Sequence, residues 1–273
     1  MKAEKKRIRA VTFDLWETLL FERDGANLQR TAARCRNLAA VLNGFGVQSS
    51  PEQVDLAIKT AISTLISAWD KNKDVSHADQ LKLIIQAIPR AAAKFKEGWL
   101  GQLSTAFVSP VFEVRPYLNS DARKVLQELK TRGKLTALIC NTGLTPGSGL
   151  RVLLAEFHVA ECFDLMIFSE EVGIRKPDPE IFNLASRGLK VEPCEAVHVG
   201  DNLKSDVWGA KNAGFKAIHL SSEEGHDKMA EADPNSLFSL SRKLGRPISG
   251  RICSDRTVGS LAMITELIDE LEV

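Results

Sequence analysis

Short apolar runs alternate with amphipathic stretches between residues 110 and 220, and this pattern constrains the fold most strongly. The runs at 135–140, 163–168, 196–199 and 215–220 each have the length of a buried strand, and stretches with helical periodicity separate them. Strands that alternate with helices form a parallel sheet through right-handed crossovers. The sequence therefore predicts an α/β protein whose core is a three-layer, Rossmann-like parallel sheet.

The first strand of this sheet is expected near the N-terminus, where the apolar run Ala10–Phe13 ends in Asp14. A parallel strand delivers the residue that follows it to the carboxyl edge of the sheet, where open α/β folds bind ligands. Asp14 is therefore the first candidate for a reactive side chain. Trp16 stands two residues later, where an acid or base would be useful.

Residues from about 27 to 108 have almost entirely helical periodicity. Ser50, Pro51 and Gln53 combine an N-cap, a proline at the first helical position and a capping-box glutamine, and so predict a helix start. Four amphipathic helices are expected, with apolar positions at 28–42, 54–69, 81–85 and 95–107. Such helices can bury their own apolar faces in a small bundle. We therefore predict a smaller helical cap domain at 21–109.

The remaining residues, 1–20 and 110–273, are predicted to form the α/β core domain. A helix is expected at 205–213 and a last helix from Ser260. The polar segment 225–250 interrupts the alternation and is interpreted as an inserted excursion.

Composition excludes several classes of partner. The chain has 36 Lys and Arg against 35 Asp and Glu, so no net basic field favours nucleic acid. Five scattered cysteines without a CxxC pair argue against a disulfide framework or a zinc site and favour a reducing, cytoplasmic location. No apolar run approaches the roughly 18 residues of a membrane span, so no membrane partner is expected. We expect a monomer or homodimer with a small-molecule substrate.

Polar residues follow the predicted strands at several points. Asp14 follows the first strand, Asn141 the second and Asp201 a later one, while Lys176 lies just past another. The carboxyl ends of parallel strands share one edge of the sheet, so these groups should converge. Carboxylates, an ammonium group and backbone amides at helix starts would suit Mg²⁺ together with a phosphate.

Two runs together carry a resemblance to a known family. Lys176-Pro177-Asp178-Pro179 and Gly200–Asp206 occur in this order after predicted strands, and with Asp14 they make the chain resemble the haloacid dehalogenase superfamily. The resemblance extends from Val11 to about Leu220, with a helical cap inserted after the first strand. It implies a Mg²⁺-dependent hydrolase that acts on a small anionic substrate through an aspartyl intermediate.

The resemblance also implies a role for each matching residue. Asp14 resembles the nucleophile, and Lys176 resembles the lysine that holds Asp14 and the transferring group. The direct Mg²⁺ ligands would be Asp14, Asp201 and the backbone carbonyl of Trp16, with Asp206 as an outer-shell carboxylate. The turn formed by Cys140, Asn141 and Thr142 resembles the phosphate-binding turn of the family.

Two positions depart from the family pattern. Phosphatases of the family carry an aspartate as general acid and base where this chain has Trp16, which cannot transfer a proton at neutral pH. Glu17 is the adjacent candidate for that role. Cys140 stands where a hydroxyl residue is expected, and Thr142 could supply a hydroxyl two places later.

The residue at position 16 keeps two other functions open. Haloacid dehalogenases have an aromatic residue there, because a halide leaves without a proton; metal-free dehalogenation of a 2-halo acid through Asp14 is therefore one alternative. A catalytically weak member that binds a ligand or a protein partner is the other.

Overall fold

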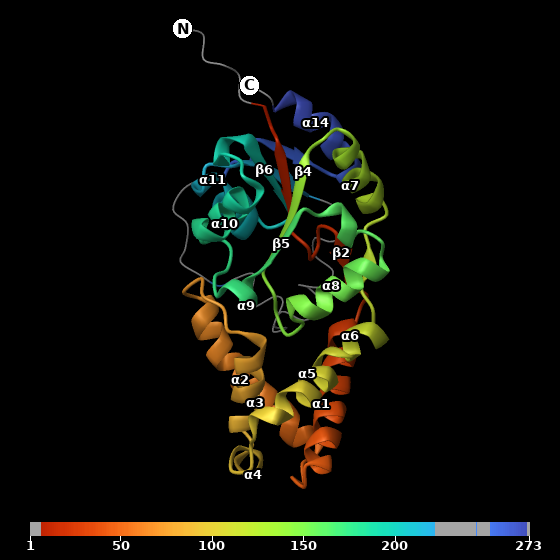
Figure 1. Ribbon diagram of the computed structural model, residues 1–273, viewed down its shortest axis with the longest axis vertical. Coiled ribbons are helices and arrows are strands. Elements are labelled where there is room, and N and C mark those ends of the chain that lie inside the picture. Colours follow the sequence, from red (N-terminus) through yellow and green to blue (C-terminus); the bar gives the residue numbers. More distant parts are fainter. Residues whose placement is uncertain (1–6, 222–243, 245–251, 272–273) are drawn as a thin grey trace.

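The computed structural model describes residues 7–221, 244 and 252–271. Within these residues, six parallel strands form one sheet in the order β5-β4-β1-β6-β7-β8 (Figure 1). They are β1 (Ala10–Phe13), β4 (Leu135–Cys140), β5 (Leu165–Phe168), β6 (Ala196–Gly200), β7 (Lys216–Leu220) and β8 (Arg256–Val258). β1 pairs with both β4 and β6, so the strand that leads into Asp14 is central. The three-layer α/β fold is confirmed.

Helices cover both faces of the sheet (Figure 1). On one face Ala10 of β1 joins an apolar cluster with α10 (Pro179–Leu189) and α11 (Gly209–Asn212). On the other face Phe13 joins a cluster with α7 (Ala122–Thr131), α8 (Gly147–Glu156) and α14 (Ile264–Glu270). Because both faces are buried, the strands are almost wholly apolar.

A bundle of helices lies beyond the carboxyl edge of the sheet (Figure 1). Its elements are α1 (Ala26–Gly44), α2 (Pro51–Trp69), α3 (His77–Gln86), α4 (Pro89–Ala92), η1 (Glu97–Trp99) and α5 (Leu100–Val108). The bundle has an apolar core of its own, which includes Leu38, Ile58, Ile84 and Phe107. The Ser50 hydroxyl accepts a hydrogen bond from the Gln53 amide, and the reciprocal bond completes the capping box. The predicted start of this helix is therefore confirmed.

Two short strands connect the bundle to the sheet. The chain leaves along β2 (Leu20–Phe21) and returns through α6 (Pro110–Glu113) and β3 (Tyr117–Leu118), and the two strands pair antiparallel. The entry and exit of the bundle thus lie side by side. The bounds 21–109 for a separate cap domain stay a prediction.

The helix predicted at 205–213 is wrong in its detail. A π-helix, η4 (Leu203–Trp208), comes first, and α11 follows it. The side chain of Asn202 accepts hydrogen bonds from the amides of Lys204 and Ser205, so the helical segment begins earlier. Most of the predicted excursion at 225–250 lies outside the described residues. No helix in the described part of the chain has the length and apolar character needed to cross a membrane.

Candidate active site

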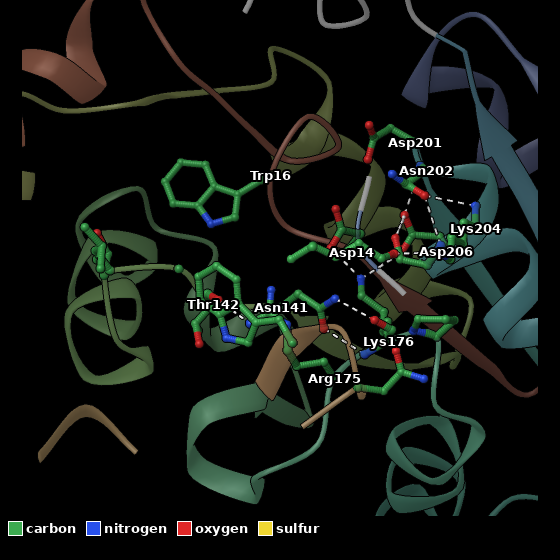
Figure 2. A pocket seen from close by; sticks show the side chains of 18 of the residues that line it. Asp14, Trp16, Asn141, Thr142, Arg175, Lys176, Asp201, Asn202, Lys204 and Asp206 are labelled. Atoms are coloured by element: carbon green, nitrogen blue, oxygen red, sulfur yellow. Dashed lines mark hydrogen bonds and ion pairs between the residues drawn. The ribbon is translucent and has the colours of Figure 1, made fainter. Parts of the chain in front are cut away.

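A pocket opens between the carboxyl edge of the sheet and the helical bundle (Figure 2). Asp14 after β1, Asn141 after β4 and Asp201 after β6 line it, and the loop between α9 (Ser169–Val172) and α10 contributes Lys176. The bundle contributes residues from α1 and from the end of α2. The sequence-predicted residues that follow the strands therefore meet at one place.

The buried ammonium of Lys176 connects two carboxylates. Its Nζ lies 2.5 Å from Asp14 Oδ1 and 2.7 Å from Asp206 Oδ1, and all three side chains are buried. Figure 2 shows Asp14 and Asp206 converging on Lys176 from different elements. A charge pair with this geometry places Lys176 where it can neutralise negative charge that develops at Asp14.

Burial shifts the protonation of these groups. Burial raises the pKa of Asp14 to about 7, because desolvation and the charges of Asp206 and Asp201 outweigh the opposing effect of Lys176. Burial alone would lower the pKa of Lys176, but Asp14 and Asp206 raise it above its usual value. Lys176 therefore stays charged at neutral pH, and Asp14 is the group whose ionisation depends on a further cation.

The acidic residues have the donor set of a hard divalent cation. Asp14, Asp201 and Asp206 each offer a carboxylate oxygen, and these atoms lie within 4.8 Å of one another. Mg²⁺ prefers such oxygen ligands. The Lys176 ammonium pairs with Asp14 and Asp206, and Asp201 adds a third carboxylate to the cluster, so negative charge gathers where a divalent cation would bind. The residues present therefore fit Mg²⁺.

Asp206 differs from the other two carboxylates in its contacts. Its Oδ1 accepts from Lys176, and its Oδ2 accepts from the Asn202 amide at 2.9 Å. His198 lies 3.2 Å from Oδ1 on the other side. Both oxygens are engaged by protein groups, which supports the predicted outer-shell role rather than direct ligation.

Gly200 at the end of β6 makes this arrangement possible. A Cβ built at this glycine would lie 2.4 Å from Asp206 Cγ, which is closer than side-chain atoms approach. Only glycine lets η4 bring Asp206 so near the strand end.

The three residues of the turn after β4 have different surroundings, and two of them, Asn141 and Thr142, line the pocket. The Cys140 thiol is fully buried in the apolar cluster and is not among the described residues that line the pocket. The Thr142 hydroxyl lies 2.8 Å from Glu170 Oε2, which engages it inside the protein. Asn141 accepts from the Lys176 amide at 2.8 Å and donates to the Lys176 carbonyl at 2.9 Å. Thr142, the predicted source of the hydroxyl, thus directs it to the Glu170 carboxylate. Asn141 holds the loop that carries Lys176, and the anion-binding role of this turn stays a prediction.

Trp16 and Glu17 occupy different places. Trp16 is half-buried and lines the pocket beside Asp14 (Figure 2). Glu17 is buried, has a φ of 61° and is not among the described pocket-lining residues. Glu17 as a replacement for the missing acid and base therefore has no support from the pocket lining and stays a prediction.

The prediction missed the charged residues that the bundle brings to the pocket. Glu22, Arg30 and Arg34 line it from the side of α1. The available signal was the spacing of Arg30 and Arg34, which places both guanidinium groups on one side of the same helix. Both arginines are buried.

The prediction also missed an ion pair that connects the bundle to the core. Asp74, in the loop between α2 and α3, forms an ion pair with Arg175 at 2.6 Å. The Arg175 guanidinium also lies 4.3 Å from the centroid of the Trp69 ring. This contact fixes the residue that precedes Lys176.

Comparisons with known proteins agree with this geometry. A family model for "Hydrolase: haloacid dehalogenase-like hydrolase" matches residues 8–214. A glyceraldehyde 3-phosphate phosphatase of Pyrococcus furiosus is 28% identical over 84% of this chain and 85% of the relative.

Two solved structures show the same fold. A 2-haloacid dehalogenase from Pseudomonas syringae pv. Tomato DC3000 superposes with a TM-score of 0.65 at 20% identity, covering 96% of this chain and 99% of the dehalogenase. A HAD phosphatase from Thermococcus onnurineus gives 0.58 at 20% identity, covering 97% and 100%. The family match covers most of the chain, the sheet is the one that these neighbours share, and the protein belongs to the haloacid dehalogenase-like hydrolases.

Proposed function

We propose that this hydrolase is a Mg²⁺-dependent phosphatase that cleaves small phosphate monoesters through Asp14. The observation that carries the proposal is the buried contact of Lys176 with Asp14, 2.5 Å long, beside the carboxylates of Asp201 and Asp206. The Pyrococcus furiosus relative, named for glyceraldehyde 3-phosphate, supports a small phosphorylated substrate.

The chemistry follows from the weakness of a carboxylate as a nucleophile. Asp14 Oδ would attack phosphorus, forming an O–P bond while the bond to the ester oxygen breaks; its electron pair leaves with that oxygen, which takes a proton from solvent to give the alcohol. Water would then attack the phosphorus of the aspartyl phosphate and give up a proton to solvent, while the bond between phosphorus and Asp14 breaks, releasing phosphate and restoring the Asp14 carboxylate. Lys176 neutralises the charge on both sides of this transfer.

The proposed cation site consists of Asp14, Asp201 and the Trp16 carbonyl. Mg²⁺ bound there would supply Lewis-acid stabilisation of the phosphoryl oxygens. The helical bundle would act as a cap that excludes water from the pocket and selects the substrate. A cytoplasmic location belongs to the same proposal, and the five cysteines, all free, support it.

Trp16 favours a second candidate. An indole beside Asp14 cannot protonate an alkoxide leaving group, whereas a halide leaves without a proton. Asp14 attack on the halogen-bearing carbon of a 2-halo acid would therefore suit this residue.

The test is a turnover screen of the full chain with and without Mg²⁺, on p-nitrophenyl phosphate, three-carbon phosphates and 2-chloropropionate. We expect phosphate release that needs Mg²⁺. Asp14→Asn should lower it by about 10³-fold or more, because the nucleophile is lost. Chloride release without phosphate release would instead establish the dehalogenase. If folded protein releases neither phosphate nor chloride from any of these compounds, the result would favour a protein that binds a ligand or partner without turnover.

A further inference from the structure

The wall of the pocket that the cap contributes contains more positive than negative charge. Arg30 and Glu22 form a buried ion pair, and Arg34 lies beside them on the next turn of α1. Among the described residues, no carboxylate forms an ion pair with Arg34. These three residues, which we call the cap wall, therefore hold two guanidinium groups against one carboxylate.

Arg34 is held in place by neutral groups. Its Nε donates to the Phe107 carbonyl at 3.0 Å, and its Nη2 donates to the Thr145 hydroxyl at 2.8 Å. Only 1% of Arg34 is exposed, and the Phe107 ring centroid lies 5.0 Å from its Cζ. The side chain is therefore rigid, and Thr145 fixes it to the core loop that follows β4.

The charge of Arg34 is poorly compensated. Burial and the neighbouring Arg30 cation lower the pKa of Arg34 to about 9, so it still carries its charge at neutral pH. Glu22 acts on the pKa of Arg34 in the opposite direction, but its carboxylate also pairs with Arg30. His77 is neutral at pH 7, because burial and the Arg34 cation lower its pKa to about 4. Glu22 Oε2 is buried and accepts no hydrogen bond from the described residues, so Glu22 engages Arg30 directly but not Arg34. Two buried guanidinium groups that share one carboxylate are incompletely neutralised, which is costly, so the cap wall favours a further anion.

The opposite end of the pocket has the reverse imbalance, which a divalent cation would cancel. Bound phosphate would lie there, against Lys176, and the cap wall would face the rest of the substrate. The excess of one positive charge on the cap wall favours a substrate group with one negative charge. Guanidinium groups bind a planar carboxylate in a bidentate manner.

We propose that the cap wall binds a carboxylate of the substrate, so that the preferred substrates are small phosphate monoesters with a carboxylate at the end opposite the phosphate. Arg34 is the principal contact and Arg30 the second. This inference rests on the proposed phosphatase function and narrows its substrate class.

The test compares three phosphates that differ at a single carbon: 3-phosphoglycerate has a carboxylate there, glyceraldehyde 3-phosphate an aldehyde and glycerol 3-phosphate a hydroxymethyl group. We expect kcat/KM for 3-phosphoglycerate to exceed that for glycerol 3-phosphate by at least about tenfold, since a charge-assisted contact is at stake. Arg34→Met should lower this ratio by about tenfold. Arg36→Met, which removes an exposed arginine from the same helix, should leave the ratio unchanged.

A variant with the opposite effect guards against simple misfolding. Glu22→Gln removes the carboxylate that competes for Arg30, so the ratio should rise by roughly three- to tenfold. D-glycerate should inhibit hydrolysis of p-nitrophenyl phosphate by the wild type more strongly than glycerol does, and Arg34→Met should abolish this difference.

The two proposals fail in different ways. Absence of phosphate release from p-nitrophenyl phosphate and from all three compounds would overturn the phosphatase function itself, whereas release from p-nitrophenyl phosphate alone would overturn only the carboxylate site. Equal kcat/KM values for the three compounds, with Mg²⁺-dependent turnover intact, would overturn only the carboxylate site. A preference for an ester with a second phosphate in place of the carboxylate, by tenfold or more, would also overturn it.

Discussion

The two ends of the pocket are built by different means. At the sheet end, Asp14 and Asp201 follow adjacent parallel strands, β1 and β6, and a lysine from a loop lies between carboxylates. At the cap end, Arg30 and Arg34 lie on one helix, and their position depends on how α1 packs against α5 and the core.

The difference shows where function is fixed and where it varies. Strand ends must converge, so the sheet end provides the chemistry common to the family. Helix packing can place almost any side chain over that site, so the cap end can change substrate without disturbing the reaction.

Removal of Lys176 should produce the largest effect at the sheet end. Lys176→Met leaves Asp14 and Asp206 without their buried partner, which should cost about 3–5 kcal/mol of unfolding free energy. The measurement is urea unfolding with EDTA present. Lys124→Met, at an exposed position on α7, is the control and should change little.

The loss of unfolding free energy caused by Lys176→Met should also depend on pH. The folded-state pKa of Asp14 lies near 7, above its usual value, so the folded protein binds a proton there more readily than the unfolded chain does. Proton binding at Asp14 therefore stabilises the fold at low pH, and this stabilisation is lost as pH rises through about 7. Lys176→Met removes the cation that lowers the pKa of Asp14, so that pKa should rise further. The free energy of unfolding of the variant should therefore be lower at about pH 9 than at about pH 6. An unfolding free energy within about 1 kcal/mol of wild type at both pH values would contradict the charge pairing.

Substitution of Trp16 tests whether the lack of an acid and base beside Asp14 makes the protein a slow phosphatase. Trp16→Asp supplies the missing acid and base, and should raise turnover of p-nitrophenyl phosphate by about 10²-fold. Trp16→Phe, which keeps an aromatic wall, should not. If the wild type already hydrolyses p-nitrophenyl phosphate rapidly and Trp16→Asp does not change kcat, another group transfers the proton. Glu17 would then be the next residue to change.

The smallest expected effect lies in the cap. The folded-state pKa of His77 is near 4, below its unfolded value, because burial and Arg34 disfavour its charged form. The unfolded chain therefore binds the proton first, and stability falls as pH drops from about 6.5 towards 4, by about 2 kcal/mol. His77→Gln should flatten this dependence in urea unfolding between about pH 7 and pH 4.5. An unchanged slope would place the acid sensitivity elsewhere, for example at His198, whose pKa burial also lowers to about 4.

Much of the fold and of the sheet end could be predicted. Alternating apolar runs predicted β4, β6 and β7 almost to the residue, and the capping box predicted the start of α2. These features depend on local periodicity and on the short-range geometry of strand ends. The meeting of Asp14, Lys176 and Asp201 followed from the same geometry.

Other details could not be predicted, because they depend on side-chain direction. The sequence placed Cys140 and Thr142 in the phosphate-binding turn, yet one thiol packs into the core and one hydroxyl pairs with Glu170. The contact of Arg175 with Asp74 joins residues 101 apart in the chain. No local pattern encodes such pairs.

The sequence by itself determined the parallel sheet, the helical bundle and the residues at the strand ends, because hydrophobic periodicity and strand direction leave few alternatives. Only the tertiary structure decided which charges face the pocket from the cap. Burial of Arg34 against Phe107 and Thr145 is a consequence of how α1 packs against α5 and the loop after β4, and that packing sets the excess charge on the cap wall.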